Sequence, residues 1–144
     1  MKKTGEYTAK GTMDASANER IQLFDGKFDT AFKVISFTIA PEDVATGDDV
    51  YAKLETELSG TDGNVWDWGD NRQLAWSRYS SISAGHGGVQ YNYVDEDNLI
   101  VEDLFIVSGP TAAGQHVNYM IHMEKYDISE WRGALAMTRN RSQS

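Results

Sequence analysis

The sequence contains no cysteine and no long apolar run. Without cysteine there are neither disulfide bonds nor thiolate metal ligands, so stability must come from packing alone, and the small disulfide-stapled secreted scaffolds are excluded. No segment approaches the roughly 18 apolar residues that a membrane-spanning helix needs. Lys2 and Lys3 resemble the basic start of a signal peptide, but no apolar stretch follows them. We therefore expect a soluble protein that has no membrane partner and does not use the usual export signal.

Positive charge is also scarce. Thirteen Lys and Arg residues stand against 22 Asp and Glu residues, which gives a formal net charge of -9. A surface with this balance repels the phosphate backbone of nucleic acids and anionic lipids. We expect no direct binding to nucleic acid.

Catalytic and metal-binding signatures are missing as well. The sequence has no G-x-S-x-G motif, and the acidic turn at residues 95–98 lacks the glycine and the distant glutamate of a calcium-binding EF-hand loop. His116 and His122 are six residues apart, so on a strand they lie about 20 Å apart, too far to bind one metal ion. We expect that the protein is not an enzyme and that it uses no cofactor and no metal.

What the sequence does contain is a succession of strand patterns. At residues 50–58, apolar side chains alternate with polar ones such as Lys53 and Glu55, which predicts a strand with one packed face and one face in water. Six further segments have strand character, and the seven together are residues 20–24, 31–40, 50–58, 73–81, 89–94, 99–107 and 116–126. A chain of 144 residues has room for one domain. The fold class that we predict is all-β: a single-domain antiparallel β-sandwich of about seven to eight strands, similar to a jelly roll.

The two ends differ from this strand-rich region. Residues 1–19 are polar, which predicts a flexible N-terminal arm, and Tyr7 and Met13 in it suit addition to the exposed strand edge of a neighbouring subunit. Residues 20–126 then form the β-sandwich. Residues 127–144 are expected to form a short C-terminal helix and tail, because Ile128, Trp131 and Leu135 fall on one helical face.

A long loop is expected at residues 59–71, from Ser59 to Asn71, and it contains Trp66 and Trp68. We interpret the two tryptophans first as packing residues of a loop that folds back on the core. A platform for a sugar or another ligand and a protein–protein contact are the two alternatives.

Four segments resemble small β-rich virion proteins of bacteriophages and other microbial viruses, of the single jelly-roll or sandwich kind. They are residues 21–26, 37–41, 66–76 and 134–143. The resemblance implies a coat or minor capsid component, located in the virion and made in the host cytoplasm, with no catalytic residues. Its partners would be further copies of itself and other virion proteins. Because the positive and negative charges of the predicted arm balance, genome contact is not expected.

Two functions follow as hypotheses. The first is a virion structural protein that acts by self-association, with possible interface residues that combine the arm, the loop and the terminal helix: Tyr7, Met13, Trp66, Trp68 and Trp131. The alternative is a monomeric, lectin-like binding module that uses the loop at residues 59–71.

Overall fold

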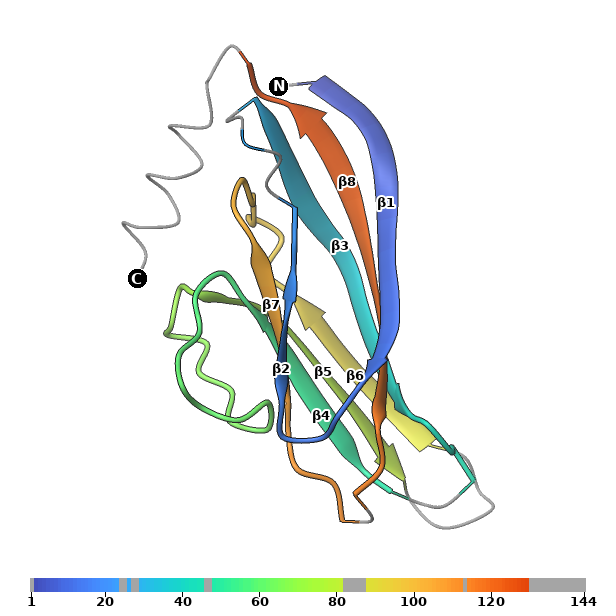
Figure 1. Ribbon diagram of the computed structural model, residues 1–144. Coiled ribbons are helices and arrows are strands. Elements are labelled where there is room, and N and C mark those ends of the chain that lie inside the picture. Colours follow the sequence, from blue (N-terminus) through green and yellow to red (C-terminus); the bar gives the residue numbers. More distant parts are fainter. Residues whose placement is uncertain are drawn as a thin grey trace.

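The computed structural model describes residues 2–23, 26, 29–45, 48–81, 88–112 and 114–129 (Figure 1). Every regular element in these residues is a β-strand, so the all-β prediction is confirmed. The strands are β1 (Lys2–Met13), β2 (Asn18–Ile21), β3 (Thr30–Pro41), β4 (Val50–Glu55), β5 (Gln73–Ser81), β6 (Gly88–Val94), β7 (Leu104–Ser108) and β8 (Val117–Asp127). In the part of the chain described, no helix is long and apolar enough to cross a membrane.

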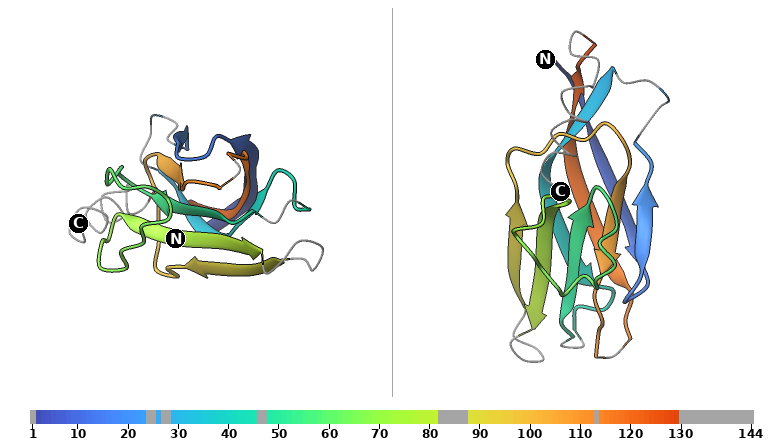
Figure 2. Two further views of the ribbon diagram at one scale, coloured as in Figure 1. Left: turned by 90° about the horizontal axis from the view of Figure 1, so that it is seen from below. Right: turned by 90° about the vertical axis from the view of Figure 1, so that its left-hand side faces the viewer.

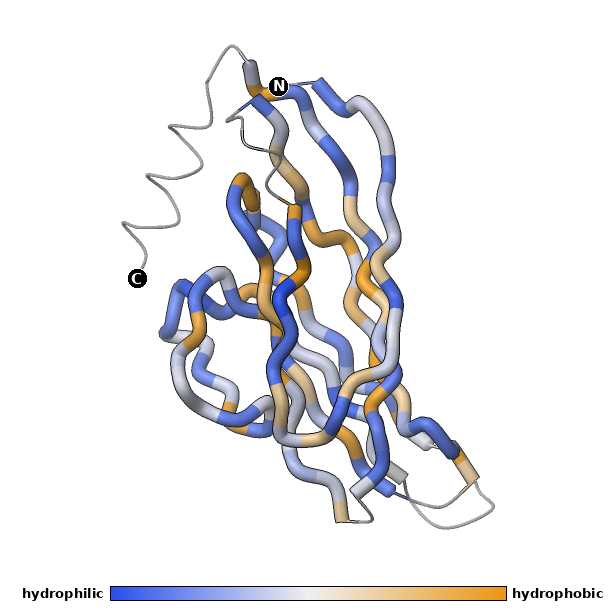
Figure 3. The backbone as a smooth tube through the Cα atoms, viewed as in Figure 1, coloured by the Kyte–Doolittle hydropathy of each residue, from blue (hydrophilic) through white to orange (hydrophobic). Residues whose placement is uncertain are grey.

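The strands form two antiparallel sheets, one with the order β1-β8-β3 and the other with the order β2-β7-β4-β5-β6. The sheets face each other as two layers, as a β-sandwich requires (Figures 1 and 2). Apolar residues recur along the strands of both sheets (Figure 3), and the buried ones form a core cluster to which both sheets contribute. Side chains with no more than 1% exposure come from both sheets and include Phe37, Ile39, Ala52, Leu54, Ile106, Ile121 and Met123.

Most strands lie close to where the sequence pattern places them. The segment predicted at residues 73–81 is confirmed with the same bounds as β5. The segment predicted at residues 99–107 is shorter, because β7 begins at Leu104. Ile100 before it is buried and makes only an isolated bridge with Phe32. An apolar run can therefore fill the core from a loop without being part of a ladder.

The expectation of a flexible N-terminal arm is wrong. Residues 2–13 form strand β1, which pairs with β8 from Lys2 opposite Asp127 to Met13 opposite Val117. The prediction weighed only the small apolar surface of this segment. A strand at the edge of a sheet needs few buried side chains, because its neighbour supplies a row of backbone hydrogen bonds. Ala9 and Met13, at 7% and 2% exposure, complete its contribution to the core.

The predicted C-terminal helix lies mostly outside the described residues. Asp127 is the last residue of β8, and its carboxylate accepts a hydrogen bond from the Ser129 N–H at 2.9 Å. This bond and a bond from the Ser129 hydroxyl lower the pKa of Asp127. Ile128 is buried with Ala31 and Val101 in a small second cluster. Trp131, which was predicted to lie on the same helical face as Ile128 and was named as a possible interface residue, lies outside the described residues.

Candidate binding surface on the outer face of the five-stranded sheet

The outer face of the five-stranded sheet is the face turned away from the three-stranded sheet. The register places Lys53 of β4, Trp76 of β5 and Tyr93 of β6 side by side in one row across it. A parallel row consists of Tyr51, Arg78 and Tyr91. Side chains of alternate residues point to the same face of a sheet, so both rows lie on this outer face. Segment 56–72, between β4 and β5, lies over part of it (Figure 2).

The two charged residues of β4 correct the prediction that its polar side chains face water. The alternation itself is confirmed for Ala52 and Leu54, which point into the core and have no exposed surface. Lys53 and Glu55, on the opposite face, are also completely buried. The covering segment 56–72 explains the difference, because it turns the outer side of β4 into a second interior.

The buried lysine binds the loop that covers it. Its ammonium group donates hydrogen bonds to the Thr61 hydroxyl (2.5 Å), the Val65 carbonyl (2.9 Å) and the Ser59 hydroxyl (3.4 Å). Its charge is balanced by the Glu55 carboxylate, with 3.6 Å between Lys53 Nζ and Glu55 Oε2. Glu55 Oε1 accepts a hydrogen bond from the Ser59 N–H at 3.3 Å. The ion pair therefore fixes the loop to the sheet at several points.

Backbone packing holds the same loop against β7. Gly63 donates its N–H to the Ser108 carbonyl at 3.2 Å. A Cβ atom at Gly63 would overlap the Val107 carbonyl oxygen and approach the Gly109 nitrogen to 2.6 Å. The close approach of loop and strand thus requires glycine at this position.

An ion pair closes the loop just before β5. Arg72 donates from Nε to Asp70 Oδ1 (3.0 Å) and from Nη2 to Asp70 Oδ2 (2.8 Å), which is bidentate geometry. The hydrogen bonds from Arg72 lower the pKa of Asp70, and Asp70 raises the pKa of Arg72 in return. The Arg72 carbonyl also accepts the Thr56 N–H at 2.8 Å, which joins the two ends of the loop.

The loop carries two tryptophans onto the aromatic residues of the sheet. The ring centroid of Trp68 lies 5.8 Å from that of Trp76 and 5.6 Å from that of Tyr93. The ring centroid of Trp66 lies 6.3 Å from that of Tyr93, and the Trp66 indole N–H donates to the Gly63 carbonyl. The Trp76 indole N–H donates to Gln73 Oε1 at 2.9 Å.

The interpretation of both tryptophans as packing residues holds only in part. The loop does fold back onto the sheet, and Trp66 is partly buried. Trp68 is 63% exposed, so for this residue the interpretation is wrong. The loop lies on the outer face of the sheet, so the Trp68 ring contacts Trp76 there and is not part of the core between the sheets.

Arg78 extends the aromatic cluster along β5 and β6. Its guanidinium lies 5.1 Å from the Tyr51 ring centroid and 5.8 Å from the Tyr91 ring centroid, so it stacks between its two cross-strand neighbours. It also forms an ion pair with Asp49 at 3.8 Å. Trp68, Arg78, Tyr91 and Tyr93 are called the aromatic surface below.

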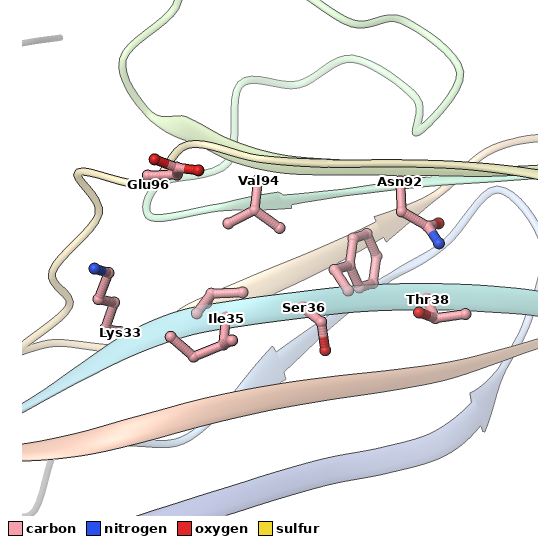
Figure 4. Close-up of a pocket in the computed structure, with 9 residues that line it drawn as sticks. Lys33, Ile35, Ser36, Thr38, Asn92, Val94 and Glu96 are labelled. Carbon is pink, nitrogen blue, oxygen red and sulfur yellow. The ribbon is translucent and has the colours of Figure 1, made fainter.

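A concave region lies between the two sheets on their β3 and β6 side. It is a groove of about 470 Å³, with Ile35 and Thr38 of β3 on one wall and Asn92 and Val94 of β6 on the other (Figure 4). The two β6 side chains point toward β3 in this view. Lys33 of β3 and Glu96 of the segment after β6 lie at one end of the groove.

Side-chain amides bond the free edge of β3 at two points along this groove. Asn98 accepts the Val34 N–H at 2.7 Å and donates to the Val34 carbonyl at 3.1 Å. Gln90 donates to the Ile39 carbonyl at 2.9 Å. Between these bonds the groove follows residues 35–38.

The predicted interface residues do not form one surface. Tyr7 is 46% exposed and meets the edge of Phe32, at a ring-centroid distance of 6.3 Å. Met13 is a core residue at 2% exposure, so it is not available to a partner. Trp66 and Trp68 are brought together on the other sheet. The sequence reasoning missed Tyr91 and Tyr93, although their i, i+2 spacing within a predicted strand places both on one face.

His116 and His122 have separate carboxylate partners. His116 lies 2.9 Å from Asp14, and His122 lies 3.3 Å from Glu6. Among the described residues, no group of three or more His, Cys, Asp or Glu side chains is placed to hold a metal ion.

Comparison with known proteins gives no assignment, because no protein-family model and no curated protein matches the chain.

Proposed function

We propose that this protein is a structural component of a virion, a coat or minor capsid protein, and that it acts by self-association. Its partners are further copies of the chain and other virion proteins, and its site of action is the particle, after synthesis in the host cytoplasm. The net charge of -9 argues against direct contact with packaged nucleic acid. The resemblance of four sequence segments to small β-rich virion proteins supports the proposal.

The strand pairing supports a jelly-roll-like fold, which is common among viral capsid proteins. A jelly roll can be described as a long hairpin rolled into two sheets, in which strand 1 pairs with 8, 2 with 7, 3 with 6 and 4 with 5. Three of these nested pairs are present here, β1 with β8, β2 with β7 and β4 with β5. The fourth pair, β3 with β6, is absent, because β6 pairs with β5 in the opposite sheet.

The observation that carries the proposal is the edge of β3 at residues 35–38, beside the groove. If β6 paired with β3, the three-stranded sheet would have a fourth strand, but β6 belongs to the opposite sheet and the groove of about 470 Å³ lies between them. The other edge strand of this sheet, β1, carries Lys2, Lys3 and Lys10, and lysines on an edge strand discourage pairing with other chains. The β3 edge along the groove has the single lysine Lys33 and an exposed Ile35. Asn98 and Gln90 bond this edge at Val34 and Ile39, and the stretch between them, residues 35–38, lies beside the groove, where it suits the addition of a short strand from a neighbouring subunit.

The proposal is tested by measuring the mass of the protein in solution by size-exclusion chromatography with light scattering. The wild-type chain is expected to run as a multiple of 16.1 kDa. Ile35→Lys places a charge on the β3 edge, where Ile35 is already 41% exposed, and is expected to return the protein to the monomer mass. Met120→Lys is the matched control: Met120 is 51% exposed on the central strand β8, away from any free edge, and this variant should assemble like wild type.

Two results would contradict the proposal. One is a wild-type protein that stays at 16.1 kDa at every concentration. The other is an Ile35→Lys variant that assembles with the same dissociation concentration as wild type, because the β3 edge would then play no part in assembly.

A further inference from the structure

The aromatic surface exposes three large rings on one face of the molecule. Trp68 is 63% exposed, Tyr93 43% and Tyr91 42%. The neighbouring Trp76, in contrast, is only 7% exposed. Transfer of an aromatic ring out of water is favourable. A contiguous exposed group of rings therefore marks a binding site more often than a single exposed apolar residue does.

The rings are held in place before any ligand arrives. Trp68 is in contact with two other rings, and the loop that carries it is fixed by the hydrogen bonds of the buried Lys53. The bidentate pair of Asp70 and Arg72 fixes the C-terminal end of the same loop. A binding site whose parts are already ordered loses less conformational entropy on binding.

The orientation of the rings favours a ligand made of small, separately oriented units. The planes of Trp68 and Tyr93 are inclined by 61°, so their faces do not form one flat apolar patch. A pyranose ring has an apolar C–H face that can cover one aromatic ring. The following sugar of the chain can rotate about the glycosidic bond and cover the second aromatic ring. The tyrosine hydroxyls and the Arg78 and Asp49 side chains supply polar groups beside the rings for the sugar hydroxyls.

The electrostatics favour a neutral ligand. The charge of Arg78 is already balanced by Asp49 at 3.8 Å and by the two tyrosine faces on which it stacks. Nucleotide bases also stack on aromatic rings, but they bring phosphates to a protein with a net charge of -9. From exposure, order, ring orientation and charge together, we propose that the aromatic surface binds a neutral oligosaccharide. This activity is independent of assembly through the β3 edge and does not require the protein to be a monomer.

The experiment is a binding screen with soluble neutral oligosaccharides, namely glucose, mannose, galactose and N-acetylglucosamine oligomers of two to six units, followed by titration of each hit. Tryptophan fluorescence and calorimetry are the two readouts. At least one series is expected to bind, and Trp68→Ala and Tyr93→Ala are each expected to weaken its binding by about tenfold or more, because each removes a stacking ring. Tyr7→Ala is the matched control, since Tyr7 is similarly exposed at 46% but lies on β1 in the other sheet.

The results that would overturn the inference are distinct from those that would contradict the assembly proposal. Absence of binding across the panel at millimolar concentrations rejects it. Binding that survives Trp68→Ala and Tyr93→Ala rejects it too, because the sugar would then occupy another site. A Trp68→Ala variant that keeps its circular dichroism but falls apart into monomers shows that the surface is a subunit contact and not a sugar site. The mass measurement on Ile35→Lys is unaffected by any of these outcomes.

Discussion

The two faces of the five-stranded sheet are both buried at β4, but by different means. The inner face is covered by the three-stranded sheet, and Val50, Ala52 and Leu54 pack there without exposed surface. The outer face is covered by a loop, and the residues buried under it are Lys53 and Glu55. Apolar burial on the inner face is favourable whatever the exact neighbours are. Burial on the outer face depends on one charge compensating another and on hydrogen bonds from the loop.

This difference explains why the inner face of the sheet stabilises the fold and the outer face carries the aromatic surface. A loop held by a buried ion pair can place Trp68 above the sheet without adding to the core. The inner face has no such freedom, because a dense interior resists changes in side-chain volume.

Breaking the ion pair is expected to have the largest effect. Lys53→Met removes the positive charge and leaves the Glu55 carboxylate buried, and Glu55 Oε2 has no hydrogen-bond partner to replace it. A buried charge that has lost its ion-pair partner typically costs about 3–5 kcal/mol of stability. Urea denaturation followed by circular dichroism measures this loss. The double variant Lys53→Met, Glu55→Leu is expected to recover most of it, because no buried charge remains; if the double variant is as unstable as the single one, packing and not charge is the cause.

A cavity on the inner face is expected to have the next largest effect. Leu54→Ala removes a side chain with no exposed surface, and such substitutions cost about 2–5 kcal/mol depending on how far the surroundings relax. The same denaturation experiment applies, with Met120→Ala on the exposed face of β8 as the control, for which little change is expected. Equal losses in the two variants would mean that the inner face of β4 is not part of the cooperative core.

The sequence predicts the inner face well and the outer face poorly. The alternation of Val50, Ala52 and Leu54 is sufficient to identify a strand and its core side, and β5 is found with its observed bounds. The same alternation assigns Lys53 and Glu55 to water, because a period of two contains no information about a loop that later covers the polar side. The pairing of β1 with β8 was missed for a related reason: it joins residues more than one hundred positions apart, and the local composition of residues 2–13 does not report the partner.

The sequence predicts only part of the candidate surface. Trp66 and Trp68 drew attention as the two tryptophans of one loop, but their position relative to Tyr91 and Tyr93 depends on the register of β5 with β6. Register is set by the packing of one face and by turn geometry, and the single sequence did not specify which residues of β5 and β6 lie opposite each other. The residues that complete the surface therefore emerge only from the folded arrangement.

The exposed tryptophan of the outer face should matter little for stability. Trp68→Phe keeps an aromatic ring on Trp76 and Tyr93 and is expected to change the free energy of unfolding by less than about 1 kcal/mol, the scale of an aromatic pair. Trp76→Phe, at a position only 7% exposed and with its indole hydrogen-bonded to Gln73, should cost more. Iodide quenching distinguishes them further: the quenchable share of the fluorescence should fall in Trp68→Phe and rise in Trp76→Phe. No change in quenching for Trp68→Phe would place its ring out of the solvent.

The smallest expected effect is the pH dependence of the ion pair between Asp70 and Arg72, which closes the loop at residues 56–72. The hydrogen bonds from the Arg72 side chain hold the pKa of Asp70 below its ordinary value of 3.8. A carboxyl group with a lowered pKa stabilises the folded state above its unfolded pKa, and this contribution disappears as the pH falls through the lower, folded value. Asp70→Asn should therefore be slightly less stable than wild type at pH 7, by less than about 1 kcal/mol for an ion pair near the surface, and the two proteins should converge as the pH drops below 3.8. Urea midpoints for both proteins between pH 2 and pH 7 measure this, and curves that stay parallel throughout would show that the ion pair does not contribute to holding the loop on the sheet.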